Sequence, residues 1–233
     1  MKQSWPQVQI ALDVLELGTA LRIARVAVAS GIGWIEAGTP LIKSEGMEAV
    51  RALSQRFPAN TVVADMKTLD AGRIECEMAF RAGAKVVSVS GLAHDSTVLD
   101  SVRTAARYDR LLMADLLGSS NPRERARVLQ KLGVDMVCLH TGIDVQRAKH
   151  SKLRASRAVR EIVKTLRIPV ATAGGVTPNS VEGLVEAGVK VIIVGGWITG
   201  SKDPAKASRQ IMEKIRDATC LGSEESAASH QVC

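Results

Sequence analysis

The sequence predicts a single parallel barrel of the (β/α)8, or TIM, class, and three observations predict it. Short apolar runs of strand length alternate with stretches of helical spacing eight times along the 233 residues. Most of the predicted helices are followed by a glycine shortly before the next strand. Hydrophobic residues make up 46% of the chain but aromatic residues only 3%, which is typical of parallel strands of Val, Ile, Leu and Ala under a cover of helices. An open doubly wound sheet is the alternative, but it has no natural use for eight regular units.

The eight units follow one another without a visible linker. The first has an apolar strand at 8–13, which ends in a carboxylate, and a helix at 19–30 that stops before Gly31. The other strands are predicted at 34–36, 61–65, 85–90, 110–115, 135–140, 169–172 and 189–194. Their helices are predicted at 45–57, 71–82, 96–108, 122–132, 153–166, 180–187 and 204–216. Residues 1–217 are therefore expected to form one catalytic domain, followed by a short, polar, disordered tail at 218–233.

The distribution of apolar and charged residues bears on partners and location. The apolar runs are strand-sized, the N-terminus has no apolar signal region, and the four cysteines lack paired or metal-binding spacing. We therefore expect a soluble, cytoplasmic protein with no membrane contact. The net charge of +7 falls largely between Arg147 and Arg167, where little acid beyond Glu161 offsets it. Because no aromatic residues are interleaved to stack bases, this segment is interpreted as a solvated helix face, with a docking surface for RNA or an acidic partner as the alternative.

Polar residues close five of the predicted strands, and in a β/α barrel the carboxyl ends of the strands form the active site. A single such residue is commonly a cap or a satisfied core group, and for Asp13 or Asp115 alone that explanation stays open. Five on one rim are difficult to explain as structure and predict a catalytic site. These strand-ending residues are Asp13, Glu36, Asp65 with Lys67, Asp115 and His140.

The stretch from Asp65 to Asp70 places three charged groups at the end of a buried strand. In an extended chain Asp65 and Lys67 face the same way, and Asp70 lies beyond the strand end. A buried carboxylate and ammonium are costly unless they are paired or bind something. The pair is either a salt bridge that closes the strand or a site where a metal or an anionic intermediate meets a fixed cation. Among carboxylates Lys67 should stay protonated, which favours electrostatic stabilisation over Schiff-base chemistry.

Three further features indicate the chemistry. Glu36 and Asp65, on adjacent strands, suit Mg²⁺, which can polarise a ketone and stabilise an enediolate. His140 is the candidate general base, because the ordinary pKa of imidazole lies near neutrality, whereas His94 is expected in a surface loop. Two glycine pairs follow the last two strands, where barrels commonly bind phosphate through backbone N–H groups. These pairs, for which two ordinary tight turns are the alternative, are Gly174 with Gly175 and Gly195 with Gly196. A phosphorylated small molecule is the predicted substrate.

The motif Asp65-x-Lys67-x-x-Asp70 after a third strand resembles that of the orotidine 5′-monophosphate decarboxylase suprafamily, and the resemblance covers about 8–216. The segments QIALD, EAGTPLI, DMKTLDAG, HTGID and AGG are similar to the 3-hexulose-6-phosphate synthase family. That resemblance implies an aldolase dependent on Mg²⁺, or Mn²⁺ as a substitute, that condenses formaldehyde with D-ribulose 5-phosphate reversibly to D-arabino-hex-3-ulose 6-phosphate. It also implies a homodimer with 6-phospho-3-hexuloisomerase as a functional partner. The implied roles are Glu36 and Asp65 at the metal, Lys67 beside the enediolate, His140 as base, and Asp70 in the partner subunit's site.

A sister family, 3-keto-L-gulonate 6-phosphate decarboxylase, shares the same charged core and remains the alternative. It typically has Glu, Arg, Thr and Arg at four positions where this chain has Asp115, Ile143, Ala173 and Gly196. All four residues favour the synthase, and an absent arginine at 143 removes the cation expected to protonate a decarboxylated intermediate. The loop from His94 to Thr97 departs from the more acidic loop expected of a synthase.

Overall fold

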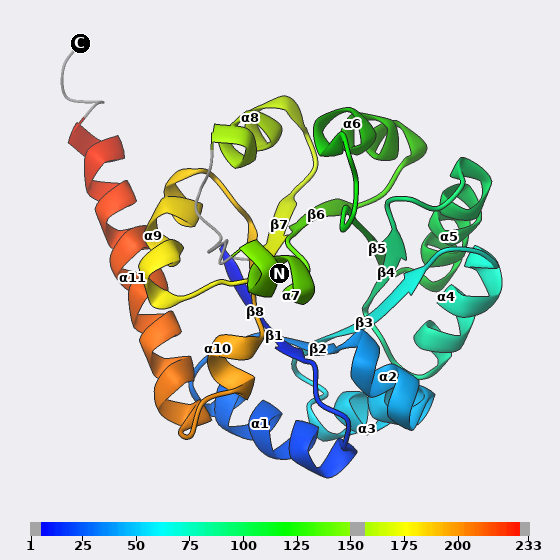
Figure 1. The fold of residues 1–233 in the computed structure, drawn as a ribbon, viewed down its shortest axis with the longest axis horizontal. Coiled ribbons are helices and arrows are strands. Elements are labelled where there is room, and N and C mark those ends of the chain that lie inside the picture. Colours follow the sequence, from blue (N-terminus) through cyan, green and yellow to red (C-terminus); the bar gives the residue numbers. More distant parts are fainter. Residues whose placement is uncertain (1–5, 150–156, 229–233) are drawn as a thin grey trace.

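The computed structural model describes residues 6–149 and 157–228 and confirms a closed parallel barrel (Figure 1). The strands pair in chain order, and β8 closes the ring against β1. They are β1 (Gln7–Leu12), β2 (Trp34–Ala37), β3 (Thr61–Thr68), β4 (Val86–Ser90), β5 (Leu111–Asp115), β6 (Met136–His140), β7 (Val170–Ala173) and β8 (Val191–Val194). All eight predicted strands are therefore present, with ends shifted by a few residues.

Helices surround the barrel, and at least one helix follows each strand in the chain (Figure 1). They are α1 (Leu17–Ala29), α2 (Thr39–Glu45), α3 (Met47–Arg56), α4 (Gly72–Arg81), α5 (Asp95–Tyr108), α6 (Pro122–Leu132), α7 (Ile143–Lys149), α8 (Arg157–Thr165), α9 (Pro178–Glu186), α10 (Gly196–Thr199) and α11 (Pro204–Ala228). The short α7 lies inside the outer ring of helices, directly after β6 (Figure 1).

Alternation along the strands produces two buried regions. Outward-facing strand residues pack against the helices in the larger apolar core. Inward-facing residues such as Val63 and Met113 form a second cluster inside the barrel. Buried polar residues share this inward-facing set: four of them lie two residues after an apolar member of the cluster, toward the carboxyl ends of the strands, and Gln9 lies two residues before Ala11. They are Gln9, Glu36, Asp65, Ser88 and Asp115.

Several helices differ from the sequence prediction. The helix expected at 45–57 is present as α3, but the sequence did not predict α2, which Gly46, with a φ of 66°, separates from α3. The helices α7 and α10 were not predicted, because seven and four residues are too few for a clear helical period. The prediction of a helix within 153–166 falls partly outside the described residues, and its described part is α8.

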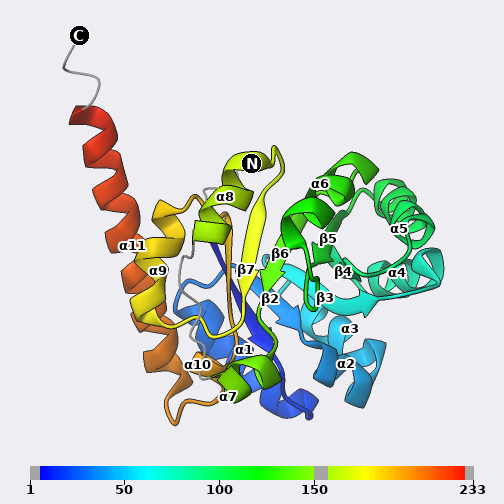
Figure 2. The same cartoon turned by 45° about the horizontal axis from the view of Figure 1, so that its top comes forward.

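The last helix is longer than predicted. The sequence places its end at 216 and a disordered tail from 218 onward, whereas α11 continues to Ala228. It packs against α1 and α9 and then extends away from the barrel (Figure 2). Glu and Ala favour helix once an upstream turn is formed, which accounts for the longer helix. Residues 229–233 lie outside the described part of the chain.

The described part of the basic segment fits a solvated helix face. On α8 the side chains of Val159 and Ile162 are buried, whereas Arg160 and Lys164 are exposed. Residues 150–156 of this segment lie outside the described part. Across the described ranges, no helix has the length and apolar character needed to cross a membrane.

Candidate active site

A bulge in β3 places the lysine of the charged motif. The pairing of β3 with β4 shifts register between Ala64 and Thr68, and Lys67 has a φ of 46°, in the left-handed region. The backbone at Lys67 is therefore not extended, although Asp65 and Lys67 face the same way, as the sequence predicted, because their side chains pair. The Lys67 N–H donates to Ser88 Oγ at 2.9 Å, and Ser88 Oγ donates to Asp65 Oδ1 at 2.7 Å. One serine on β4 thus fixes both the bulge and the carboxylate before it.

The ammonium of Lys67 lies between two buried carboxylates. Its Nζ pairs closely with Asp65 Oδ2 and is 3.2 Å from Asp115 Oδ2. Burial alone would lower the pKa of Lys67, but the charges of Asp65 and Asp115 raise it above its usual value. Lys67 is consequently a protonated, fixed cation at neutral pH, as the sequence predicted, and lacks the free amine that Schiff-base chemistry needs.

The imidazole of His140, at the end of β6, contacts the carboxylate at the end of β5. Nδ1 of His140 is 2.8 Å from Asp115 Oδ2, and the Leu117 N–H donates to Asp115 Oδ1 at 2.9 Å. Burial would raise the pKa of Asp115, but the His140 hydrogen bond and the charge of Lys67 hold it below its usual value. Since an ionised carboxylate only accepts, Nδ1 carries the proton, and Nε2 is the basic nitrogen of the neutral ring.

The two residues expected at a metal stand on neighbouring strands. Asp65 is held by Ser88 and by Thr39, whose Oγ1 lies 2.8 Å from Asp65 Oδ2. Gln9 donates to Glu36 Oε2. Burial and the nearby carboxylates of Asp65 and Asp13 raise the pKa of Glu36 well above its usual value. Mutual repulsion among buried, oxygen-only donors is relieved by a hard divalent cation, so this set fits Mg²⁺.

Asp13 lies at the same rim in a more open position. Burial and the charge of Asp65 raise the pKa of its carboxyl. A Cβ at Gly38 would lie 2.2 Å from Asp13 Oδ1, and one at Gly195 would lie 3.6 Å from Asp13 Oδ2. The carboxylate therefore occupies space that glycine at position 38 leaves free, next to the loop that follows β8.

A second group of ligand atoms gathers around His140. One ligand atom each from Asp115, Cys138 and His140 lies within 4.8 Å of the others. The spacing of cysteines in the sequence predicted no metal-binding role for any of them. Spacing along the chain cannot show that Cys138 lies beside Asp115, because only the register of β5 with β6 brings the two together. Burial raises the pKa of the Cys138 thiol well above its usual value, and Asp115 adds to the effect.

The glycines after β7 and β8 differ in what they require. Gly174 and Gly175 have φ values of 95° and 71°, and a Cβ on Gly174 would lie 2.1 Å from the Thr141 carbonyl oxygen. Around a Cβ on Gly196 there is nothing within 4 Å. The backbone conformation at Gly174 and Gly175 therefore favours glycine, whereas Gly196 faces open space at the start of α10.

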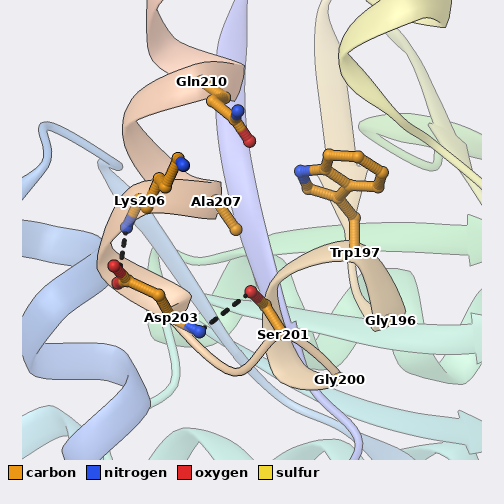
Figure 3. Close-up of a pocket in the computed structure, with 8 residues that line it drawn as sticks. All are labelled: Gly196, Trp197, Gly200, Ser201, Asp203, Lys206, Ala207 and Gln210. Carbon is orange, nitrogen blue, oxygen red and sulfur yellow. Dashed lines mark hydrogen bonds between the residues drawn. The ribbon is translucent and has the colours of Figure 1, made fainter.

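A cavity of ≈320 Å³ lies next to this second loop (Figure 3). Trp197 on α10 and Gln210 on α11 face it from opposite sides, while Asp203 caps the first turn of α11 by accepting from the Lys206 N–H at 2.9 Å (Figure 3). Its lining contains none of the rim carboxylates. The ionisable candidate residues therefore lie at the barrel mouth, and of the predicted phosphate-binding glycines the cavity is lined only by Gly196.

Two candidates stand apart from the rim contacts. Asp70 is exposed in the loop between β3 and α4. His94 is exposed at the start of α5, and its Nδ1 accepts from the Ser96 N–H at 3.2 Å, which gives it a helix-capping role.

The sequence analysis missed three polar residues that position the rim carboxylates, namely Gln9, Thr39 and Ser88. Polar residues inside apolar strands were the available signal for Gln9 and Ser88.

Comparison with known proteins fits this arrangement. The family model described as orotidine 5′-phosphate decarboxylase / HUMPS family matches residues 6–211. A 3-hexulose-6-phosphate synthase of Mycobacterium gastri is 37% identical over 209 residues, which cover 90% of this chain and 99% of that protein. The crystal structure of 3-hexulose-6-phosphate synthase from Salmonella typhimurium superposes with a TM-score of 0.85 at 31% identity, covering 91% and 99% of the two chains. That of 3-keto-L-gulonate-6-phosphate decarboxylase from Vibrio cholerae has a TM-score of 0.79 at 27% identity, covering 92% and 99%.

The protein is thus a closed β/α barrel with a lysine held between carboxylates at its mouth. The chain belongs to the orotidine 5′-phosphate decarboxylase / HUMPS family. Its relatives at 37% and 31% identity within these comparisons are 3-hexulose-6-phosphate synthases. The family resemblance expected from the sequence is confirmed.

Proposed function

We propose that this protein is a Mg²⁺-dependent aldolase that interconverts D-ribulose 5-phosphate plus formaldehyde and D-arabino-hex-3-ulose 6-phosphate. The observation that carries the proposal is the chain of contacts from Asp65 through Lys67 and Asp115 to His140. It combines a fixed cation with an oriented base at the rim of a barrel whose relatives are named for that synthase. We further propose that the enzyme works in the cytoplasm beside a 6-phospho-3-hexuloisomerase.

The residues divide the reaction between them. The glycine loops after β7 and β8 hold the phosphate, and so place C1 of the pentulose near His140. Nε2 of His140 removes a C1 proton, and Lys67 stabilises the negative charge that develops on the substrate oxygens. Glu36 and Asp65 would hold Mg²⁺, which would supply Lewis-acid polarisation of the substrate carbonyl. Carbon–carbon bond formation with formaldehyde follows, and the imidazolium of His140 returns a proton to the new hydroxyl.

An exposed apolar face supports a homodimer with shared active sites. Leu69, Ile74 and Met78 are 63%, 53% and 46% exposed. Ile74 and Met78 lie one turn apart on α4, and Leu69 precedes that helix beside Asp70. Exposed large apolar side chains grouped on and beside one helix in this way are typical of an interface. Its burial against a second copy would carry Asp70 toward the neighbouring subunit.

The test is an assay of pentulose phosphate consumption with formaldehyde, with and without EDTA. We expect turnover that requires Mg²⁺ or Mn²⁺ and no borohydride trapping of substrate on Lys67. Full activity in excess EDTA, or a trapped lysine adduct, contradicts the proposal. Release of CO₂ from 3-keto-L-gulonate 6-phosphate, without aldol activity, replaces it with the sister activity.

A binding barrel is the outcome if no pentulose phosphate turns over. In that case the exposed basic residues Arg160 and Lys164 become the functional candidates. Salt-dependent RNA binding that disappears when both are replaced by Ala identifies that class.

A further inference from the structure

The mouth of the barrel carries two different kinds of metal donor on opposite sides of Lys67. On the side of β2 and β3 the donors of Glu36 and Asp65 are carboxylate oxygens only. On the side of β5 and β6, Asp115, Cys138 and His140 offer a carboxylate oxygen, a sulfur and an imidazole nitrogen within 4.8 Å of one another. Oxygen donors select Mg²⁺, whereas thiolate and imidazole select Zn²⁺ and related ions.

We propose that Asp115, Cys138 and His140 form a binding site for a thiophilic divalent cation such as Zn²⁺, separate from the Mg²⁺ ligands. Cys138 is inward-facing and 1% exposed, next to Asp115 in the register of β5 with β6. Three protein ligands of these types leave one position of a tetrahedral ion open. The partly exposed ring of His140 lies on the solvent side of the cluster, where a water can complete the coordination.

The proton balance of binding is simple. Cys138 binds as a thiolate and gives its proton to solvent, while His140 binds through an unprotonated ring nitrogen. An ion in this position also binds Asp115, the carboxylate that contacts both His140 and Lys67. Occupancy therefore removes both the base and the orientation of the base, so Zn²⁺ at this site is an inhibitor of any chemistry that His140 performs.

The direct test follows the thiolate-to-metal charge-transfer absorption when Cd²⁺, a spectroscopic substitute for Zn²⁺, is added to the metal-free enzyme. The parent for all variants carries Cys220→Ser and Cys233→Ser, which leaves Cys76 and Cys138 as its thiols. We expect one equivalent of Cd²⁺ to produce the band in this parent. Cys138→Ser should abolish the band, and Cys76→Ser should keep it.

His140→Gln should retain the thiolate but weaken Cd²⁺ binding at least about tenfold, because even an outer partner of a ligand is worth roughly 10–100-fold in affinity. Circular dichroism confirms the fold of each variant, and competition with a chromophoric chelator measures Zn²⁺ affinity without reference to activity. No band in the parent, an undiminished band in Cys138→Ser, or equal Zn²⁺ affinity in the parent and folded Cys138→Ser overturns the proposal. Absence of aldolase activity in the wild type would overturn the proposed function, whereas the Cd²⁺ and Zn²⁺ measurements test this site independently.

Discussion

The imidazole Nδ1 of His140 lies 2.8 Å from Oδ2 of Asp115, and this contact assigns the basic role to the other ring nitrogen. Substitution of His140 by Ala should therefore abolish proton abstraction while leaving the phosphate loops intact. We expect a loss of roughly 10²–10⁴ in rate, the usual contribution of a positioned acid–base group. The measurement is Mg²⁺-dependent uptake of deuterium from D₂O into C1 of ribulose 5-phosphate without formaldehyde. His94→Ala, at an exposed helix cap, is the matched control and should exchange normally; unchanged exchange in folded His140→Ala would reassign the base to a rim carboxylate.

Asp115 should also give stability that depends on pH. Its folded-state pKa is lowered, so the unfolded chain takes up its proton first as the pH falls. The stabilising contribution is present above the unfolded pKa of about 3.9 and is lost as the pH falls through the lower folded value. Urea unfolding of the wild type and Asp115→Asn should show a difference at pH 6 that shrinks below about pH 4.

Asp135 provides a comparison of opposite sign, because burial raises the pKa of its carboxyl. The wild type should lose stability relative to Asp135→Asn as the pH rises through the folded pKa of Asp135. The wild type is compared with Asp115→Asn in one experiment and with Asp135→Asn in the other. If the difference in unfolding free energy changes with pH in the same direction in both, Asp115 is not stabilised as an anion.

Glu36→Gln should separate metal affinity from fold stability. The change removes one anionic donor, so Mn²⁺ binding, followed by electron paramagnetic resonance, should weaken at least about tenfold. It also removes a carboxylate whose pKa is raised by burial and by Asp65, so the metal-free variant should melt at a higher temperature than the metal-free wild type. Glu48→Gln, at an exposed position on α3, should change neither quantity. Equal Mn²⁺ affinity in wild type and Glu36→Gln would exclude Glu36 as a ligand.

The two glycine loops should respond differently to alanine. Gly174→Ala forces a Cβ to 2.1 Å from the Thr141 carbonyl at a φ of 95°, and should destabilise the fold by more than about 1 kcal/mol. Gly196→Ala meets nothing within 4 Å and should keep stability to within about 0.5 kcal/mol. If phosphate binds beside α10, Gly196→Ala should nevertheless raise the inhibition constant of inorganic phosphate. An unchanged constant would place the phosphate elsewhere.

Charge on the exposed face of α4 should dissociate the proposed dimer. The double variant Ile74→Asp, Met78→Asp should sediment as a monomer in analytical ultracentrifugation and lose activity, because the partner's Asp70 is withdrawn from each site. Arg160→Asp on α8 changes an exposed residue away from that face and should leave sedimentation unaltered. A monomeric wild type with full activity would contradict shared sites.

The fold was predictable because alternation and helical spacing are local properties. Each strand of the barrel is a short apolar run, and Glu36 and Asp115 are conspicuous because each is a carboxylate ending such a run. Helices α7 and α10 escaped prediction because a helix of one or two turns has no period to detect. The length of α11 was not predictable, because the composition of the polar residues after 216 does not decide whether they continue the preceding helix.

The candidate site was predictable in its ionisable members and not in their geometry. The bulge at Lys67 requires pairing with β4 and a hydroxyl from Ser88, two features set by distant parts of the chain. The approach of Cys138 to Asp115 similarly follows from strand register. Sequence patterns identify which residues can ionise, whereas register determines which of them meet.

The backbone is left-handed at both Lys67 and Ala71, a conformation that lowers the stability of this short segment. Each such residue other than glycine costs about 1–2 kcal/mol, and the two bracket the turn that carries Asp70 outward. Selection for stability alone would favour glycine at both positions. At 71 that exchange has no chemical cost, whereas at 67 it would remove the only side chain that joins Asp65 to Asp115 among the described residues. Under the proposed function the ammonium of Lys67 is required despite its strained backbone, and Ala71 is the position where the barrel can gain stability without losing that cation.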